Sequence, residues 1–368
     1  MAGVSTVVFS LLVMALGGLG SASAASSGAS PAAIGYAKSV VASQAKPITF
    51  GYNPGKLPGS VAGKRVVEVV DQTASGAENA SLVASGAKIL GINFQVVSVG
   101  ATSEDVSNAF TNIVNTDSNL GGVIADGFDP TSWMPQFEAL TAAHIPIVLV
   151  AVTCGAQWAS YVKVLAPCTG TKQASQKPAD WIIADSDGHP GNTVVFTTAG
   201  LPILTAASNA FIAQFKKLCA ACTLNVQTVP LTSIATTLPA TVVAYLQANP
   251  TTKYVFMTFG DMMIGVPPAV KAAGITGVKF TTASAAPTDV QYVNQGSEAS
   301  VTAYPLPLTS YVAIDALSRL MLKANMSVVK SWAFPTQLMT KSNVSTFPAT
   351  GYAPTPGLVS YFKKLWNK

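Results

Sequence analysis

Short apolar runs alternate with helical periods in the first half of the chain. The apolar runs contain few charges, which is typical of strands covered on both faces, and they are Arg65–Asp71, Asn93–Val99, Gly122–Ala125 and Pro146–Val152. Between the second and third runs, Val106, Phe110 and Ile113 recur at the spacing of one helix face. Alternation of strands and helices predicts parallel strands with right-handed crossovers. This stretch is therefore predicted to be a doubly wound α/β unit.

The same alternation returns in the second half. Strands are predicted at residues 193–198, 224–229, 254–258, 278–282, 300–304 and 337–340, and helices at 205–218, 240–248, 261–273 and 311–323. A helix over 179–184 is expected to open at Pro178, after an irregular stretch over 153–176. A length of 368 residues allows two domains of ordinary size.

The N-terminus carries the one apolar run that approaches the length of a membrane span. It covers Val4–Gly20 and is followed by Ser21-Ala22-Ser23-Ala24, which fits a signal-peptidase site before Ala25. The segment before the run has no Lys or Arg, so an uncleaved membrane anchor is the alternative. Because no Cys precedes Cys154, lipid attachment at this cleavage point is excluded. Residues 1–24 are interpreted as a signal peptide of a protein exported to the cell envelope or periplasm.

Four cysteines agree with export, because an exported chain favours disulfides. They allow three pairings, of which the local one joins Cys154 to Cys168 and Cys219 to Cys222. The second pair could instead be a redox site. It follows a helical run, however, and the C-terminal end of a helix disfavours a thiolate, so a structural disulfide is the favoured interpretation.

Composition and motifs argue against several function classes. Only 10% of residues are charged, and the basic ones are scattered, so no nucleic-acid partner is expected. The chain has two histidines, His144 and His189, and neither a G-x-S-x-G nor a G-x-G-x-x-G motif. Carboxylates do follow several strands, where Asp is most often a helix cap, at Asp71, Asp126, Asp129, Asp261 and Asp289. We expect no enzyme, cofactor or metal site.

Three segments, in this order and spacing, resemble a known family. They begin GKRVVEVVDQTASGAENA, GGVIADGFDP and YVFMTFGDMMIG, and with the sequence around them they are similar to type I periplasmic solute-binding proteins of the ribose/galactose-binding-like group, the substrate-binding components of ABC importers. The resemblance covers residues 62–345, and the long lead, the Cys pairs and the ending FKKLW resemble proteins of high-GC Gram-positive bacteria.

The resemblance implies two doubly wound parallel-sheet α/β domains that are joined by a three-segment hinge and close on a ligand. The first domain would hold residues 62–170 and 305–330, and the second 171–304 and the tail 331–368. Residues 25–61 would form an N-terminal lead or strap.

The resemblance also implies a ligand site at the carboxyl ends of the strands. The matched positions are Gln72, Thr73, Ser75, Asp126, Phe128, Thr153, Leu201, Phe259, Ser284 and Tyr304. Sugar binders of this group carry an Asp-Arg pair where this chain has Ala151-Val152, and an Asp where it has Ser284. Without these charged groups a hexose or pentose is disfavoured, and the remaining side chains favour a neutral ligand that is partly hydrophobic or aromatic. Phe128 and Phe259 could equally be core residues.

The function expected from these observations is capture of a small molecule by an exported monomer, which delivers it to the membrane permease of an ABC importer. A receptor of the same fold that presents its ligand to a membrane sensor is the main alternative. A carbohydrate-binding protein with an atypical site and a secreted enzyme are the others.

Overall fold

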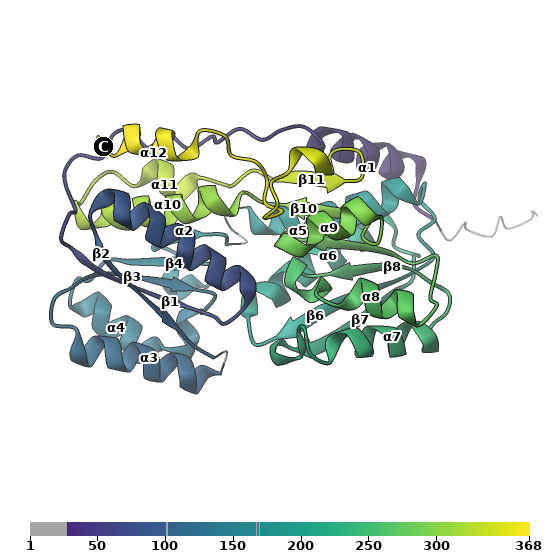
Figure 1. Ribbon diagram of the computed structural model, residues 1–368, viewed down its shortest axis with the longest axis horizontal. Coiled ribbons are helices and arrows are strands. Elements are labelled where there is room, and N and C mark those ends of the chain that lie inside the picture. The colour runs from purple at the N-terminus through teal and green to yellow at the C-terminus, as the bar shows by residue number, and fades with distance from the viewer. Residues whose placement is uncertain (1–27, 101, 167, 169) are drawn as a thin grey trace, which may run out of the picture.

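The computed structural model describes residues 28–368 except 101, 167 and 169, and it shows two α/β domains side by side (Figure 1). Each domain has its own sheet with helices on both faces. The predicted fold class, two doubly wound parallel-sheet α/β domains joined by a three-segment hinge, is confirmed. The predicted signal peptide, residues 1–24, lies outside the described residues.

The first domain contains an all-parallel sheet. Its strands lie in the order β2-β1-β3-β4-β5 and are β1 Arg65–Val70, β2 Asn93–Ser98, β3 Leu120–Asp126, β4 Ile147–Val150 and β5 Val162–Val164. Helix α2 (Ala74–Leu90) packs beside α10 (Leu306–Met321) on one face. Helices α3 (Ser103–Thr116) and α4 (Met134–Ala142) cover the other, where the Trp133 ring stacks on Phe110 with centroids 3.7 Å apart.

The second domain repeats this strand order and adds one antiparallel edge strand. Its order is β11-β10-β9-β8-β6-β7, with β6 Asn192–Ala199, β7 Leu224–Pro230, β8 Thr252–Met257, β9 Lys279–Ala283, β10 Ser300–Ala303 and β11 Gln337–Thr340. Its helices are α5 Thr171–Asp185, α6 Pro202–Leu218, α7 Leu238–Ala248, α8 Val266–Ala272 and α9 Pro287–Gln295. Strands β6, β8 and β9 thus occupy the places that β1, β3 and β4 hold in the first domain.

The two ends of the chain also cross between the domains. Helix α1 (Pro31–Gln44) packs on α5 of the second domain, and the strap after it places Tyr52 and Leu57 in the core of the first. The tail was expected to belong to the second domain, but it contacts both domains. Residues 344–353 pack on the second domain, whereas α12 (Leu358–Leu365) packs on α10 of the first domain. Within the described residues the chain therefore passes between the domains five times, including the three expected hinge segments.

A buried ion pair anchors both chain ends to α10. The Asp315 carboxylate accepts from Arg319 Nε at 2.6 Å, from Trp366 Nε1 at 2.7 Å and from the Tyr52 hydroxyl. Arg319 also donates to the Gly55 carbonyl at 2.6 Å. Asp315 and Arg319 are almost fully buried, so removal of one partner would leave an uncompensated charge. The network thus joins the strap, α10 and the last helix.

Several predicted helices begin elsewhere, and α10 starts at Leu306 rather than at residue 311. Helix α5 starts at Thr171 and carries Pro178 inside it, because burial of Ala174, Pro178 and Ile182 along one face outweighs the missing hydrogen bond. The predicted helix 261–273 is divided at Gly265, whose φ of 77° ends a short 3-10 turn before α8. The stretch predicted to be irregular contains β5 and the start of α5. Three helices were not predicted, namely α9, α11 (Ser327–Ser331) and α12.

The cysteines pair locally, Cys154 with Cys168 and Cys219 with Cys222, at Cα distances of 5.9 and 5.4 Å that suit disulfides. Within residues 28–368, apart from the three gaps, no helix has the length and apolar character needed to span a membrane.

Candidate functional site

Loops at the carboxyl ends of strands from both domains line a cavity of about 90 Å³. The first domain and the start of α10 provide Asp71, Thr73, Ser75, Gly76, Asn79, Asp126, Gly127, Ala151, Leu165 and Leu306. The second domain provides Leu201, Ile203, Leu204, Phe259, Ser284 and Tyr304. Ligands of open α/β sheets bind at such strand ends, so this cavity is the candidate site.

Two carboxyl groups of the first domain line the cavity. Asp126 ends β3, and its Oδ2 accepts from Asn79 Nδ2 at 2.5 Å. The Asn79 carbonyl in turn accepts from the Ser310 hydroxyl at 2.6 Å, which fixes the orientation of the amide. Asp71 follows β1, and its Oδ1 accepts from the backbone amide of Thr73 at 2.7 Å. The framework of the domain therefore holds both carboxyl groups in place.

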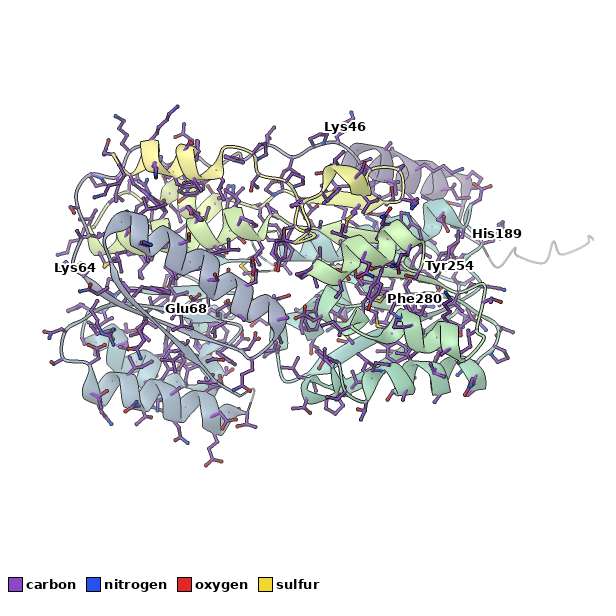
Figure 2. All side chains as sticks on the ribbon, in the orientation of Figure 1. Lys46, Lys64, Glu68, His189, Tyr254 and Phe280 are labelled. Carbon is purple, nitrogen blue, oxygen red and sulfur yellow. A yellow bond between two sulfur atoms is a disulfide. The ribbon has the colours of Figure 1, made fainter. Side chains whose placement is uncertain are left out.

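The pKa of each of these two carboxyl groups is raised. Burial, reinforced by the charge of Asp71, raises the pKa of Asp126 to about 7. Burial also raises the pKa of Asp71. Glu68 lies behind Asp126, inside the first domain, whereas Lys64 and His189 lie at the outer surface (Figure 2). Burial, and then the charge of Asp126, raises the pKa of Glu68. The lining residues include no Lys, Arg or His whose positive charge would balance the carboxylates of Asp71 and Asp126.

A direct contact joins the two domains at the N-terminus of α2. Asp261 of the second domain accepts from the Ser75 backbone amide at 3.1 Å and from the Ser75 hydroxyl at 3.0 Å. The N-terminus of a helix favours a negative charge, and Ser75 lies in the first turn of α2. Burial nevertheless raises the pKa of Asp261, although the Ser75 hydrogen bonds oppose the rise. The structure thus has the cleft closed over the cavity.

The second domain contributes mainly hydrocarbon. Leu201, Ile203 and Leu204 begin α6, and Phe259 follows β8. Leu201 lies above Gly127 of the first domain: a Cβ at Gly127, where φ is 85°, would meet Leu201 Cδ2 at 3.6 Å and Asp71 Oδ2 at 3.1 Å. The missing side chain at Gly127 lets the two domains approach.

Two equivalent strand ends have unusual backbone conformations. Ala151 follows β4 with φ of 50°, and Ser284 follows β9 with φ of 71°. Each backbone amide donates to the next strand, Ala151 to Val164 at 2.9 Å and Ser284 to Thr302 at 2.9 Å. Left-handed residues other than glycine are costly and tend to occur at binding sites, so these turns mark the same edge of both sheets.

Seven of the ten expected site residues line the cavity, namely Thr73, Ser75, Asp126, Leu201, Phe259, Ser284 and Tyr304. Gln72 is exposed beside it. Phe128 lies in the core instead, where its carbonyl accepts from Trp133 Nε1, and Thr153 hydrogen-bonds Asp129 through its backbone amide at 2.8 Å. The role of the seven in binding stays a prediction.

Several lining residues were not expected, above all Asp71 and Asn79, and neither was the contact of Asp261 with Ser75 across the cleft. The sequence did signal the two aspartates, because both follow strands, but they were interpreted as helix caps. Asn79 lies on α2, and only its burial beside Asp126 shows that it belongs to the site.

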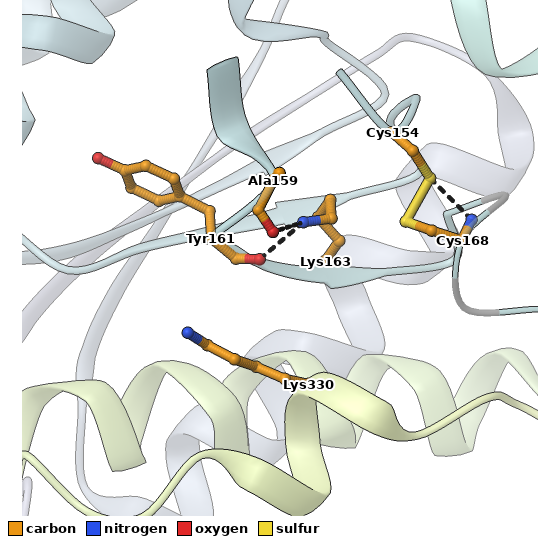
Figure 3. Close-up of a pocket in the computed structure, with 6 residues that line it drawn as sticks. All are labelled: Cys154, Ala159, Tyr161, Lys163, Cys168 and Lys330. Atoms are coloured by element: carbon orange, nitrogen blue, oxygen red, sulfur yellow. Dashed lines mark hydrogen bonds between the residues drawn. A yellow bond between two sulfur atoms is a disulfide. The ribbon is translucent and has the colours of Figure 1, made fainter. Parts of the chain in front are cut away.

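Another cavity, of about 220 Å³, lies beside β5 and shares no lining residue with the first (Figure 3). Lys163 Nζ donates there to the carbonyls of Trp158, Ala159 and Tyr161 at 2.8–3.1 Å. Burial, and then the charge of Lys330, lowers the pKa of this amine. Lys163 therefore stabilises the loop before β5.

The sequence model of the periplasmic binding protein domain matches residues 80–325. The chain belongs to the periplasmic binding protein family. The family consists of extracytoplasmic substrate-binding proteins, which take small molecules and work with ABC permeases. No curated protein matches this periplasmic binding protein.

Solved structures share the fold of this periplasmic binding protein at low identity. A solute-binding protein of Actinobacillus succinogenes with bound D-allose is 16% identical, with a TM-score of 0.65 over 77% of this chain and 99% of that one. A myo-inositol-binding protein of Caulobacter is 16% identical, with a TM-score of 0.67 over 77% and 94%. A putative LacI transcriptional regulator of Bacteroides fragilis is 12% identical, with a TM-score of 0.65 over 78% and 100%. The fold alone therefore does not identify the ligand.

Proposed function

We propose that this chain is an exported solute-binding protein, which captures a small, partly hydrophobic organic molecule in the interdomain cleft and delivers it to an ABC importer. The observation that carries the proposal is the cavity itself, because both domains line it and Ser75 and Asp261 close it. Hinge closure around a ligand requires such a divided site. The apolar side chains of the second domain would contact the hydrocarbon part of the ligand.

The sugars bound in the related structures are not proposed as ligands of this chain. The positions that carry charged sugar contacts in the resembling group hold Ala151 and Ser284 here, and the lining residues include no arginine. The two cysteine pairs would form disulfides after export. These features support a binding protein whose ligand differs from a free hexose or pentose.

The test is ligand-dependent closure. The purified protein is incubated with pools of small solutes, retained molecules are identified by native mass spectrometry, and small-angle scattering measures the radius of gyration. We expect one unchanged molecule per chain and a smaller radius of gyration. A chemically altered solute would instead indicate an enzyme. For delivery, the loaded protein should stimulate ATP hydrolysis by its reconstituted permease and ATPase, and a loaded protein without this effect would contradict the importer role.

A further inference from the structure

Two carboxyl groups of the first domain, Asp71 and Asp126, line the cavity, and no basic side chain lines it with them. Both side chains are more than nine-tenths buried. Asp261 of the second domain is engaged by Ser75 across the cleft and is not among the lining residues. A ligand in the cavity therefore meets carboxyl groups of the first domain.

One oxygen of the pair is open to a ligand. Asp126 uses Oδ2 for Asn79, and its Oδ1 receives no hydrogen bond from any described residue, whereas Asp71 is hydrogen-bonded by both the backbone amide and the side chain of Thr73. The side chains of Asp126 and Asp71 are 6% and 8% exposed and line the cavity. Carboxyl oxygens that face a cavity accept hydrogen bonds, so this pair indicates a ligand that donates them.

The arrangement suits an organic cation better than a metal ion. In the part of the chain that the structure describes, no group of three His, Cys, Asp or Glu side chains is placed to hold a metal. An ammonium group offers three donors and interacts with carboxylates spread around it. The facing Leu201 and Phe259 supply an apolar surface.

We propose that the ligand is a compact primary amine, whose ammonium group binds between Asp71 and Asp126 and whose hydrocarbon part lies against Leu201 and Phe259. This inference rests on the proposed function, and it replaces the expectation of a neutral ligand. The cavity of about 90 Å³ is well below the usual few hundred, so the closed cleft accepts only a few heavy atoms.

The amine would displace protons from the site. Burial and the neighbouring Asp71 raise the pKa of Asp126 to about 7, so this carboxyl group is largely protonated at pH 6. An aliphatic amine remains protonated up to about pH 10. Because the ammonium group favours the ionised carboxyl, affinity should rise between pH 6 and pH 8.

The experiment compares matched amines and alcohols on the full chain by calorimetry at pH 6 and pH 8. The probes are isobutylamine with isobutanol, cyclohexylamine with cyclohexanol, ribose, myo-inositol and calcium chloride. We expect one amine per chain, binding about fivefold or more tighter at pH 8 with proton release, and no binding of the alcohols, the polyols or calcium. Equal binding of an amine and its alcohol, binding of calcium, or no amine binding at 10 mM would overturn the proposal.

Variants locate the charge contact. Asp126→Asn should weaken amine binding about tenfold or more and abolish the pH dependence, whereas the control Glu298→Gln, buried in the second domain outside the cavity, should change neither. Circular dichroism checks folding, and Asp71→Asn serves if Asp126→Asn does not fold. Amine binding unaffected in the folded variant contradicts the proposal. Closure on isobutanol or cyclohexanol without amine binding would end this proposal while the proposed function stands.

Discussion

The two domains have the same strand order, yet their equivalent strand ends carry opposite chemistry. After β1 and β3 the first domain places Asp71 and Asp126, whereas after β6 and β8 the second places Leu201 and Phe259. The second domain has a comparable acid pair, Asp289 and Glu298, but these two side chains are buried inside that domain and do not line the cavity. The repeated fold thus supplies two similar frames, and only the loop residues give the cleft an acidic and an apolar side.

Leu201→Asp is the strongest test of this division, because it puts a carboxylate on the apolar side. Leu201 is 4% exposed and lies near Asp71, so the new charge would be both buried and repelled. We expect a loss of about 2 kcal/mol or more in the free energy of unfolding, with a larger radius of gyration. Urea denaturation and small-angle scattering measure these, and the surface control Val359→Asp should show neither. An unchanged variant would mean that the two sides do not meet.

The pH dependence of stability tests the acidic side. A carboxyl whose folded pKa is raised binds more protons in the folded state than in the unfolded state, so the free energy of unfolding falls as pH rises through this window. For Asp126 the window runs from about 4 to about 7. We expect a decrease on the order of 1–2 kcal/mol between pH 5 and pH 7.5 in urea denaturation.

Asp126→Asn should make that slope shallower, and Glu298→Gln should do the same from the second domain, because burial followed by the charge of Asp289 raises the pKa of Glu298. If stability rose with pH and neither variant altered the slope, the raised pKa values would be wrong.

Ser75→Ala should have the smallest effect. It removes the hydroxyl that donates to Asp261 at 3.0 Å but leaves the backbone amide in place. We expect the closed form to lose about 1 kcal/mol relative to the open form, which lowers ligand affinity about fivefold. Calorimetry measures it against Ser39→Ala, which removes an exposed hydroxyl on α1. Equal affinities for both variants would show that the Ser75 hydroxyl does not hold the cleft closed.

The fold was largely predictable from the sequence because parallel strands appear as short apolar runs. The ranges of β1, β2, β7 and β9 agree with the predictions to within one residue. Helices were harder, because burial rather than local signals fixes their ends: Pro178 was expected to begin a helix and lies inside α5. The cap of α3 is Thr102, whose hydroxyl accepts from the Asp105 amide, although Ser103 beside it is of an equally suitable residue type.

The candidate site was predictable only in part, because its chemistry depends on contacts between distant segments. Strand ends identified Asp126, Leu201 and Phe259, since parallel sheets bring such positions together. Nothing local shows that Asp261 crosses the cleft to Ser75, 186 residues away in sequence. Phe128 illustrates the opposite case, because its neighbour Trp133 brings it into the core.

The network around Asp315 imposes an order on biosynthesis. The domain that begins at β1 needs Tyr52 from the strap and Trp366, which directly follows α12, to satisfy that carboxylate. A ribosome adds Trp366 only after every strand of the second domain has been made. The domain that is started first is therefore finished last, and a nascent or truncated chain that lacks its final helix leaves that core open.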